Sequence, residues 1–298
     1  MDALDLVPEK TIPCLDLGFV TLVDVMPRIV PDGQTCDYAI AQMARVSYGQ
    51  GTKSLNEDRG LIRYLLRHSH TSPFEGIELK FHMKMPVFIA RQAIRHRTCS
   101  LNEISGRYSV MKDEFYFPSA NEIRAQSKSN KQGSEGKLQH EDAENFEKII
   151  RQQCRDSYAW YQNMLEAGMA REQARMILPL NLYTEWYWKQ DLHNLLHFLA
   201  LRSDTHAQYE IRVYAEAILK LIQPLVPWTL EAWNDYHVMR NAVKLTALEC
   251  EAIKKHNLRQ EQTQGVSWMG FLDSDNKREQ SEWVEKAKEL GFNILDKA

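Results

Sequence analysis

Nine residues, Ile77 to Met85, alternate strictly between apolar and polar side chains, and this stretch constrains the fold more than any other. Successive side chains of a β-strand point to opposite faces, so the alternation predicts a strand with one buried face and one polar face. Pro86 follows directly, and its fixed φ suits the first position of a helix. The sequence therefore predicts a strand followed by a helix that runs from Pro86 to about Arg97.

Periodicity and breaker residues predict the other elements. Strands are expected at 17–26 and 114–118, and helices at 36–47, 57–68, 143–167 and 171–178. A helix that carries His193 and His197 ends at Arg202, and further helices are expected from 206 to Pro224 and from Pro227 to about His256. The aromatic stretch 183–201 is typical of a core, and the polar residues 126–144 indicate a surface insertion.

Composition excludes several classes of protein. The 298 residues carry a formal charge of −3, with 37 basic and 40 acidic side chains, so no global basic field is available to bind nucleic acid. The sequence contains no run of about 18 apolar residues, so no membrane span is expected. The acidic first residues lack a signal-peptide pattern. The five cysteines are scattered without a C-x-x-C pair, which favours neither a disulfide framework nor a cysteine zinc site and fits a cytoplasmic location.

The fourteen residues from Arg95 to Tyr108 concentrate charge after the predicted strand and helix. They include three arginines, a histidine, a glutamate, two serines and a glycine. Guanidinium groups resist burial unless they are paired, and their planar fork matches phosphates and carboxylates. The cluster therefore predicts a cradle for a small multiply charged anion such as a nucleotide. A solvated surface loop or an ion-pair network remains the structural alternative.

Other candidate sites are weaker. His193 and His197 lie four residues apart, a spacing that can grip zinc, but Asn194 replaces the glutamate of a metalloprotease and no third ligand is evident. Cys99 lies among arginines that could lower its pKa, but packing is the simpler role. Ser105 has no histidine and carboxylate pair placed to activate it. No metal site is expected, and an RNA-binding module would need a basic face.

A resemblance to a known family rests on the cluster. Arg95-His96-Arg97, Ser100, Asn102-Glu103 and Ser105-Gly106-Arg107-Tyr108 resemble the signature of the flavin-dependent thymidylate synthases. Further matches follow in the family's order over roughly residues 13–235: Arg45-Val46-Ser47, His70 to Glu75, Arg91-Gln92, Ala174-Arg175, Leu178 to Asn181 and Arg202 to Gln208. The family position at Ser72 commonly holds threonine, and serine keeps the hydroxyl.

The resemblance implies an α+β fold, with a mixed sheet flanked by several long helices. It implies a catalytic domain at 1–235 and leaves 236–298 as a C-terminal helical extension of unknown role. The residue pattern of that extension predicts a short amphipathic helix that carries Trp283 to Leu290. Family members form homotetramers whose active sites are shared between subunits.

The resemblance also implies roles for individual residues. The implied dUMP-binding residues are Gln92, Arg95, Glu103, Ser105, Gly106, Arg107, Arg175 and Arg202. The implied FAD-binding residues are Ser72, Arg95, His96, Arg97, Glu103, Asp191, His193 and His197. We choose Arg202 as the catalytic cation, because an always-charged guanidinium can stabilise an enolate-like pyrimidine without gaining or losing a proton.

The implied reaction is the reductive methylation of dUMP to dTMP. The resemblance gives 5,10-methylenetetrahydrofolate as carbon donor, NADPH as reductant, and no enzyme cysteine nucleophile. The alternative is a regulatory protein that binds nucleotide or flavin without catalysis. The sequence leaves open the contacts of folate and NADPH, the route of the carbon, and whether the side chains or only the backbone of His193 and His197 touch FAD.

Overall fold

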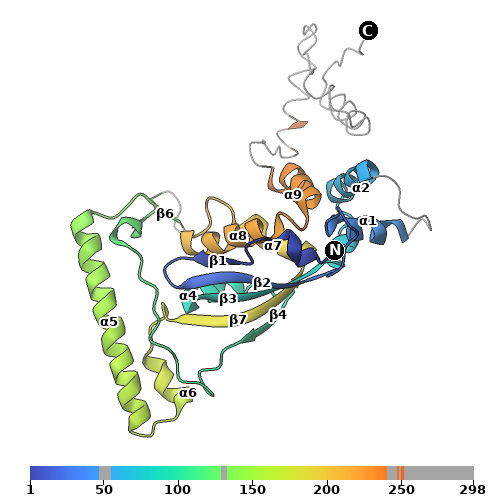
Figure 1. Cartoon of the computed structure of the whole chain (residues 1–298). Coiled ribbons are helices and arrows are strands. Elements are labelled where there is room, and N and C mark those ends of the chain that lie inside the picture. The colour runs from blue at the N-terminus through green and yellow to red at the C-terminus, as the bar shows by residue number, and fades with distance from the viewer. Residues whose placement is uncertain (47–54, 129–132, 240–246, 248–249, 252–298) are drawn as a thin grey trace, which may run out of the picture. The chain divides into compact units, whose positions relative to one another are not determined.

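The computed structural model describes residues 1–46, 55–128, 133–239, 247, 250 and 251. The chain divides into two compact units, Met1–Val238 and Met239–Ala298, and the second unit lies almost entirely outside the described residues. The expected tail helix around Trp283 falls there too. The first unit, shown in Figure 1, contains the sheet and the helices that position the candidate site.

Five strands form the main sheet of this unit, in the spatial order β1-β2-β3-β7-β4. Their bounds are Thr11–Cys14 (β1), Gly18–Met26 (β2), Glu78–Pro86 (β3), Ser100–Glu103 (β4) and Tyr183–Asp191 (β7). Every pairing in this sheet is antiparallel, so the α+β class is confirmed but the expectation of a mixed sheet is wrong. A separate hairpin joins β5 (Ala125–Gln126) to β6 (Ser134–Glu135).

Helices connect and follow these strands in the first unit. The α-helices are Asp37–Val46 (α1), Leu55–Arg67 (α2), Ser72–Glu75 (α3), Val87–Ala93 (α4), His140–Glu166 (α5), Arg171–Ala174 (α6), Leu192–Arg202 (α7), Tyr209–Ile222 (α8) and Pro227–Trp233 (α9). Short 3-10 helices span Ala3–Leu6, Ala120–Glu122 and Arg175–Ile177, and a π-helical turn spans Asn234–Val238.

The predicted strand at 77–85 is confirmed as β3, which lies between β2 and β7. Its partner β7 pairs with it over the full length, from Glu78 opposite Asp191 to Pro86 opposite Tyr183. The aromatic residues Trp186 and Trp188 of β7 are buried, as the core assignment of 183–201 requires. The strand itself was not expected, because polar Thr184 and Gln190 occupy buried positions and interrupt the apolar alternation.

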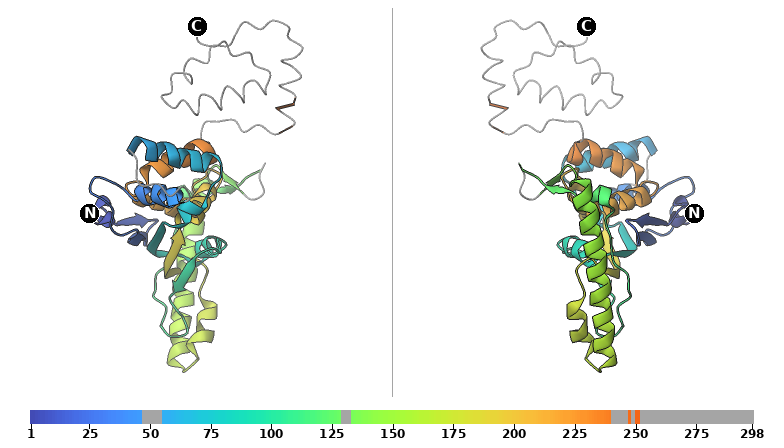
Figure 2. Two further views of the ribbon diagram at one scale, coloured as in Figure 1. Left: turned by 90° about the vertical axis from the view of Figure 1, so that its right-hand side faces the viewer. Right: turned by 90° about the vertical axis from the view of Figure 1, so that its left-hand side faces the viewer.

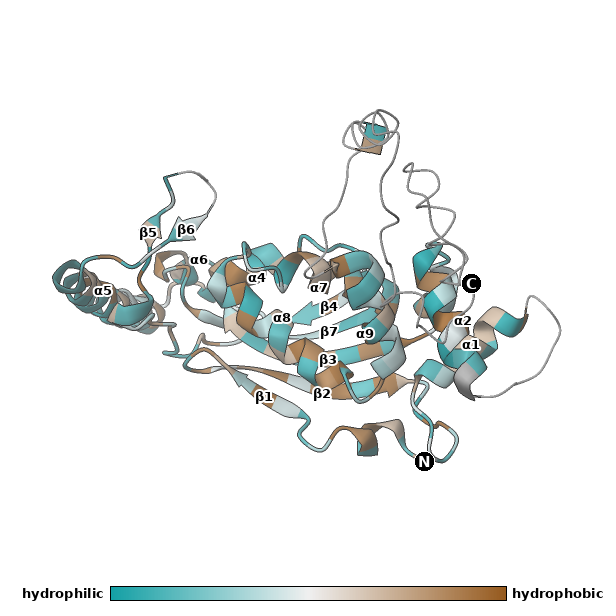
Figure 3. Cartoon of the chain, turned by 90° about the horizontal axis from the view of Figure 1, so that it is seen from above, coloured by the Kyte–Doolittle hydropathy of each residue, from teal (hydrophilic) through white to brown (hydrophobic). Residues whose placement is uncertain are grey.

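Helices α4, α7, α8 and α9 lie over the sheet in the view from above (Figure 3). Helix α8 buries an apolar face whose members are Ile211, Tyr214, Ala215, Ala217, Ile218, Leu221 and Ile222. The Tyr214 hydroxyl donates to the Lys84 carbonyl at 2.8 Å and so ties this helix to β3. A Cβ at Gly18 would lie 2.0 Å from that hydroxyl, so the start of β2 requires a glycine.

Helix α5 lies at the end of the sheet away from α1, α2 and α9 (Figures 1 and 2). It contributes Cys154 and Tyr161 to a second, smaller core together with Phe115 and Leu182. The Tyr161 hydroxyl accepts a hydrogen bond from the Met111 amide at 3.0 Å. This core anchors the chain after the arginine cluster against the segment that carries Arg175.

Three sequence expectations need correction. The helix after Pro86 ends at Ala93 instead of Arg97, because Arg95 and His96 form short-range turns that lead into the unexpected edge strand β4. The expected strand at 114–118 is reduced to one bridge, between Phe115 and Leu182. The helix from Pro227 does not run unbroken to His256, since Met239 has a φ of +50°.

A carboxylate from α1 accepts hydrogen bonds at the start of the helix α9. Asp37, which is fully buried, accepts hydrogen bonds from the Trp228 amide at 2.8 Å, the Thr229 amide at 3.2 Å and the Thr229 hydroxyl at 2.6 Å. These amides are among the first N–H groups of a helix, which have no partner within it. The contact therefore joins two helices that are 191 residues apart in the sequence.

Within the described part of the chain, no helix combines the length and the apolar character that a membrane crossing would require.

Candidate active site

One cavity of about 390 Å³ collects five of the sequence-predicted site residues. Its lining holds Arg95, His96, Arg97, Thr98, Gln190, Asn194, His197, Leu201 and Arg202. The first four follow α4, Gln190 comes from β7, and the last four come from α7. Three guanidinium groups therefore line a cavity whose wall, all of it within the described residues, contains no carboxylate. Such a wall suits an anion or an electron-rich ring.

Arg202 and His96 contact each other in this cavity. The Arg202 Nε donates to the His96 Nε2 at 3.1 Å. An imidazole nitrogen that accepts a hydrogen bond carries no proton, so a neutral His96 has its proton on Nδ1. Burial, followed by the positive charges of Arg202 and His197, lowers the pKa of His96 from 6.5 to about 4. His96 is therefore uncharged at neutral pH.

This depressed pKa predicts a pH dependence of stability. An unfolded chain binds a proton at His96 near pH 6.5, whereas the folded chain binds it only near pH 4, so the free energy of unfolding should fall as the pH falls through that window. The slope belonging to His96 should disappear in His96→Gln. Urea unfolding of both proteins between pH 4.5 and 8 measures it, and parallel curves over that range would contradict the prediction.

Gln190 adds an acceptor to the same wall. This side chain is 2% exposed, and its Nε2 donates to the Thr98 carbonyl at 3.2 Å. Its Oε1 is buried and has no hydrogen-bond partner among the described residues. Burying an amide oxygen without a donor costs on the order of 1–3 kcal/mol. A ligand N–H that reaches this oxygen would remove that cost.

A second cavity, of about 250 Å³, collects Glu103, Gly106 and Arg175. Glu103 ends the edge strand β4 and accepts a hydrogen bond from the Thr184 hydroxyl on β7. A Cβ at Gly106 would lie 3.0 Å from both the Arg175 Cδ and the Met111 Sδ. The glycine thus lets the Arg175 side chain cross the loop closely, which brings a guanidinium to the Ser105–Arg107 segment.

The neighbours of Gly106 lie in the same loop. The Ser105 Oγ accepts from the Arg107 amide at 3.3 Å, so the hydroxyl shapes the turn. Arg107 is exposed, and its Nε forms an ion pair with Glu172 at 3.1 Å. An exposed pair of this kind contributes little to stability, so Arg107 can exchange its partner for a ligand phosphate at small cost.

The remaining sequence-predicted residues line neither cavity. Ser72 begins the short helix α3, and His193 lies in the first turn of α7. Asp191 caps α7, where its carboxylate accepts from the Asn194 amide at 2.9 Å and from the Asn194 side chain at 2.8 Å. Gln92 donates to the Gln208 side chain, beside the start of α8. The roles predicted for these four residues, like those of the residues that line the two cavities, remain predictions.

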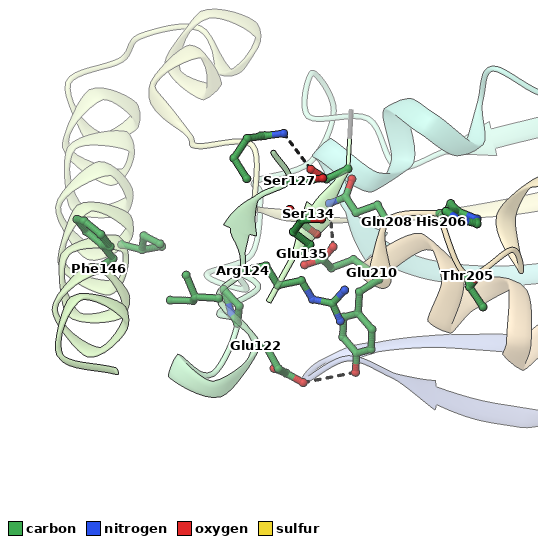
Figure 4. Close-up of a pocket in the computed structure, with 17 residues that line it drawn as sticks. Glu122, Arg124, Ser127, Ser134, Glu135, Phe146, Thr205, His206, Gln208 and Glu210 are labelled. Atoms are coloured by element: carbon green, nitrogen blue, oxygen red, sulfur yellow. Dashed lines mark hydrogen bonds between the residues drawn. The ribbon is translucent and has the colours of Figure 1, made fainter. Parts of the chain in front are cut away.

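Gln208 also lines a larger cavity, of about 700 Å³, which Figure 4 shows. Its residues come from the segment 118–124, from the β5–β6 hairpin, from α5, from the loop after Arg202 and from the start of α8. The charged side chains in its wall are Glu122, Arg124, Glu135 and Glu210. Because carboxylates predominate there and none of the predicted ligand-binding residues lines it, this cavity suits an anionic ligand less well than the two smaller cavities.

The cysteine and the histidines that were weighed as alternatives occupy ordinary positions. Cys99 is half-buried, and its Sγ donates to the His96 carbonyl at 3.2 Å. Among the residues that the structure describes, no three His, Cys, Asp or Glu side chains gather as metal ligands would.

The sequence analysis did not select the cavity residues Thr98, Gln190 and Asn194. Only the recognition of 183–191 as a strand would have indicated that Gln190 shares a face with Trp186 and Trp188.

Comparisons with known proteins show which family the chain is similar to. A family model described as thymidylate synthase complementing protein matches residues 28–228. Flavin-dependent thymidylate synthases from Dictyostelium discoideum and Thermus thermophilus are each 53% identical, with coverage of 92% and 82% of this chain and 86% and 85% of those proteins. The solved structure of a UMP/dUMP methylase, PolB from Streptomyces cacaoi bound with 5-Br dUMP, is 31% identical with a TM-score of 0.67, and covers 76% of this chain and 99% of that one.

The extent of these matches identifies the family. The family model spans well over half of the chain, and two relatives at half identity cover most of it. The arginine cluster, which first indicated the resemblance, lies inside the matched region. The chain therefore belongs to the thymidylate synthase complementing protein family and is a methyltransferase of the flavin-dependent thymidylate synthase class.

Proposed function

We propose that this chain converts dUMP to dTMP with FAD as cofactor, 5,10-methylenetetrahydrofolate as carbon donor and NADPH as reductant. The single observation that carries the proposal is the cavity in which Arg95, Arg97 and Arg202 meet without a carboxylate. Related proteins support the substrate class, since one solved relative is a UMP/dUMP methylase bound with 5-Br dUMP.

The residues of the cavity fit a flavin as well as a pyrimidine. The orphaned Gln190 Oε1 matches the imide N–H that both rings carry, and the guanidinium groups match the phosphates of FAD. We assign Arg95, His96, Arg97 and His197 to FAD, with Ser72, Glu103, Asp191 and His193 as further contacts. When bound, the flavin supplies the hydride chemistry, and the protein supplies orientation and charge.

Arg202 is the group that activates the pyrimidine in this proposal. Methylation at C5 requires electron density there, which rises when a cation stabilises negative charge on the ring's carbonyl oxygens and N3. Burial lowers the pKa of Arg202, but the intrinsic pKa of a guanidinium is so high that the group stays charged. Its charge is therefore constant through the reaction.

We propose that no enzyme thiol takes part. The Cys99 Sγ donates to the carbonyl of His96, so the thiol hydrogen is engaged within the loop. The Ser105 hydroxyl is occupied with the amide of Arg107. Neither geometry resembles a nucleophile held by a general base.

The phosphate of dUMP is assigned to the second cluster, Ser105, Gly106, Arg107 and Arg175, with Gln92, Arg95 and Glu103 completing the site. Separate cavities hold the ring-binding and phosphate-binding groups in one chain, which supports a homotetramer with shared active sites. The scattered free cysteines support a cytoplasmic location.

A visible spectrum of the purified protein, followed by NADPH oxidation assays on the same sample, tests the proposal. We expect flavin bands, oxidation that depends on dUMP, and dTMP once methylenetetrahydrofolate is added. A sample without dUMP is the control. A protein that binds neither FAD nor dUMP after reconstitution would exclude the function, whereas binding of both without turnover would favour the regulatory alternative.

A further inference from the structure

We propose that His96 is a positioning residue for Arg202, because its neutral imidazole fixes the guanidinium through an uncharged acceptor. The cation is thereby held in place without being neutralised. This inference rests on the role proposed for Arg202, and it assigns to His96 a task separate from any contact with the flavin.

The hydrogen bond uses only one of the N–H groups of Arg202. Its Nε donates to the His96 Nε2 at 3.1 Å, and the four N–H bonds of the terminal nitrogens remain for a ligand. Among the described residues, no carboxylate lies within 4.0 Å of Arg202. In contrast, Arg28, Arg63 and Arg107 each form an ion pair with Asp or Glu.

This contrast has an electrostatic consequence. A carboxylate partner would orient Arg202 equally well but would cancel most of the field that it projects into the cavity. A neutral imidazole orients the group and leaves the field intact. Preorganised charge is what stabilises an anionic transition state, so the choice of partner bears directly on the rate.

The His96 ring is itself fixed from the same helix. It packs edge-on against Phe198, with ring centroids 4.9 Å apart and an interplanar angle of 78°. Phe198 and Arg202 are four residues apart on α7, so they lie on one face of it. The Phe198 ring packs against the imidazole, and Arg202 donates a hydrogen bond to its Nε2. On the loop side, the His96 amide donates to the Ala93 carbonyl at 3.1 Å.

Two substitutions of His96 differ in whether they keep a hydrogen-bond acceptor at the position of Nε2. In His96→Gln the side-chain oxygen reaches about as far as Nε2 and still accepts from Arg202, whereas the shorter side chain of His96→Asn does not reach. Both variants are polar and uncharged, which makes them a matched pair. We expect His96→Asn to lower kcat by about 10- to 100-fold, the range for one hydrogen bond to a charged group, and His96→Gln to lose far less.

Three readouts separate this role from flavin binding. Calorimetry with dUMP alone should show weaker binding by His96→Asn than by His96→Gln, while the absorbance of bound FAD should be similar in the two. In an Arg202→Lys background, which removes the Nε–H donor, the difference between Gln and Asn at position 96 should disappear. Nitrogen NMR of labelled histidine should report a wild-type Nε2 that carries no proton.

The proposal is overturned if Gln and Asn are equally impaired at equal FAD content, or if their difference persists with Lys at position 202. The assay of the wild type comes first, since failure of dUMP-dependent turnover there would reject the proposed function itself. The NMR result stands apart from turnover, and a protonated Nε2 would reject the positioning role even in an active enzyme.

Discussion

Arg202→Ala is expected to lower kcat for dTMP formation by on the order of 10²-fold or more, the cost of removing one preorganised donor to developing charge. Arg202 lies at the C-terminal end of α7, half-buried in a cavity with no carboxylate in its wall. The Arg202→Ala variant should fold, because Arg202 makes no ion pair among the described residues.

Turnover at saturating dUMP, with the FAD content determined by absorbance, measures this effect. Arg155→Ala is a matched control, since Arg155 is an exposed arginine of α5 that bonds to nearby Gln152. If Arg202→Ala raised KM for dUMP and left kcat unchanged, Arg202 would bind substrate and transition state alike, and the activating role would be wrong.

Asp37→Ala is expected to lower the free energy of unfolding by about 2–4 kcal/mol. The substitution leaves two amides and one hydroxyl without an acceptor at the start of α9, in a fully buried setting. The Thr35 hydroxyl also donates to Asp37, at 3.5 Å, and four hydrogen bonds to a charged group would suggest a larger loss. Burial, however, raises the pKa of Asp37 to about 6, so desolvation of the carboxylate offsets part of their stabilisation.

Urea unfolding at pH 7.5 and one fixed protein concentration measures this loss. Thr229→Val keeps the amide donors and removes only the hydroxyl, and we expect it to cost about 1 kcal/mol. Equal losses in the two variants would mean that the amides at the start of α9 do not depend on Asp37.

The parts of the fold that the sequence predicted share one property, a regular pattern that coincides with burial. The strand β3 followed from strict alternation, and α8 from an apolar face at helical spacing. The strand β7 was not predicted, because Thr184 and Gln190 are buried polar residues and Tyr187 is an exposed aromatic one. The length predicted for the helix α4 was too great. The residues Arg95 and His96 carry no turn signal of their own, and the turn there is imposed by the tertiary structure.

The candidate site divides in the same way. Residue types and their order were enough for the resemblance, which selected Arg95 to Arg97, Glu103, Ser105 to Arg107 and Arg202. The contact between Arg202 and His96 joins residues 106 positions apart, and no local pattern encodes it. The orphaned oxygen of Gln190 depends on how a strand and a loop meet, which composition and spacing do not contain.

The strand β7 sets a fixed distance between the two clusters. Gln190 lines one cavity and Thr184 lines the other, and both are on the same face of this strand. Six residues of extended chain span about 20 Å, and the flanking strand β3 keeps this length rigid along its whole course. A nucleoside monophosphate is shorter than that. The strand therefore holds Gln190 and Thr184 further apart than the length of one nucleotide, so a single nucleotide cannot contact both residues of the same chain at once.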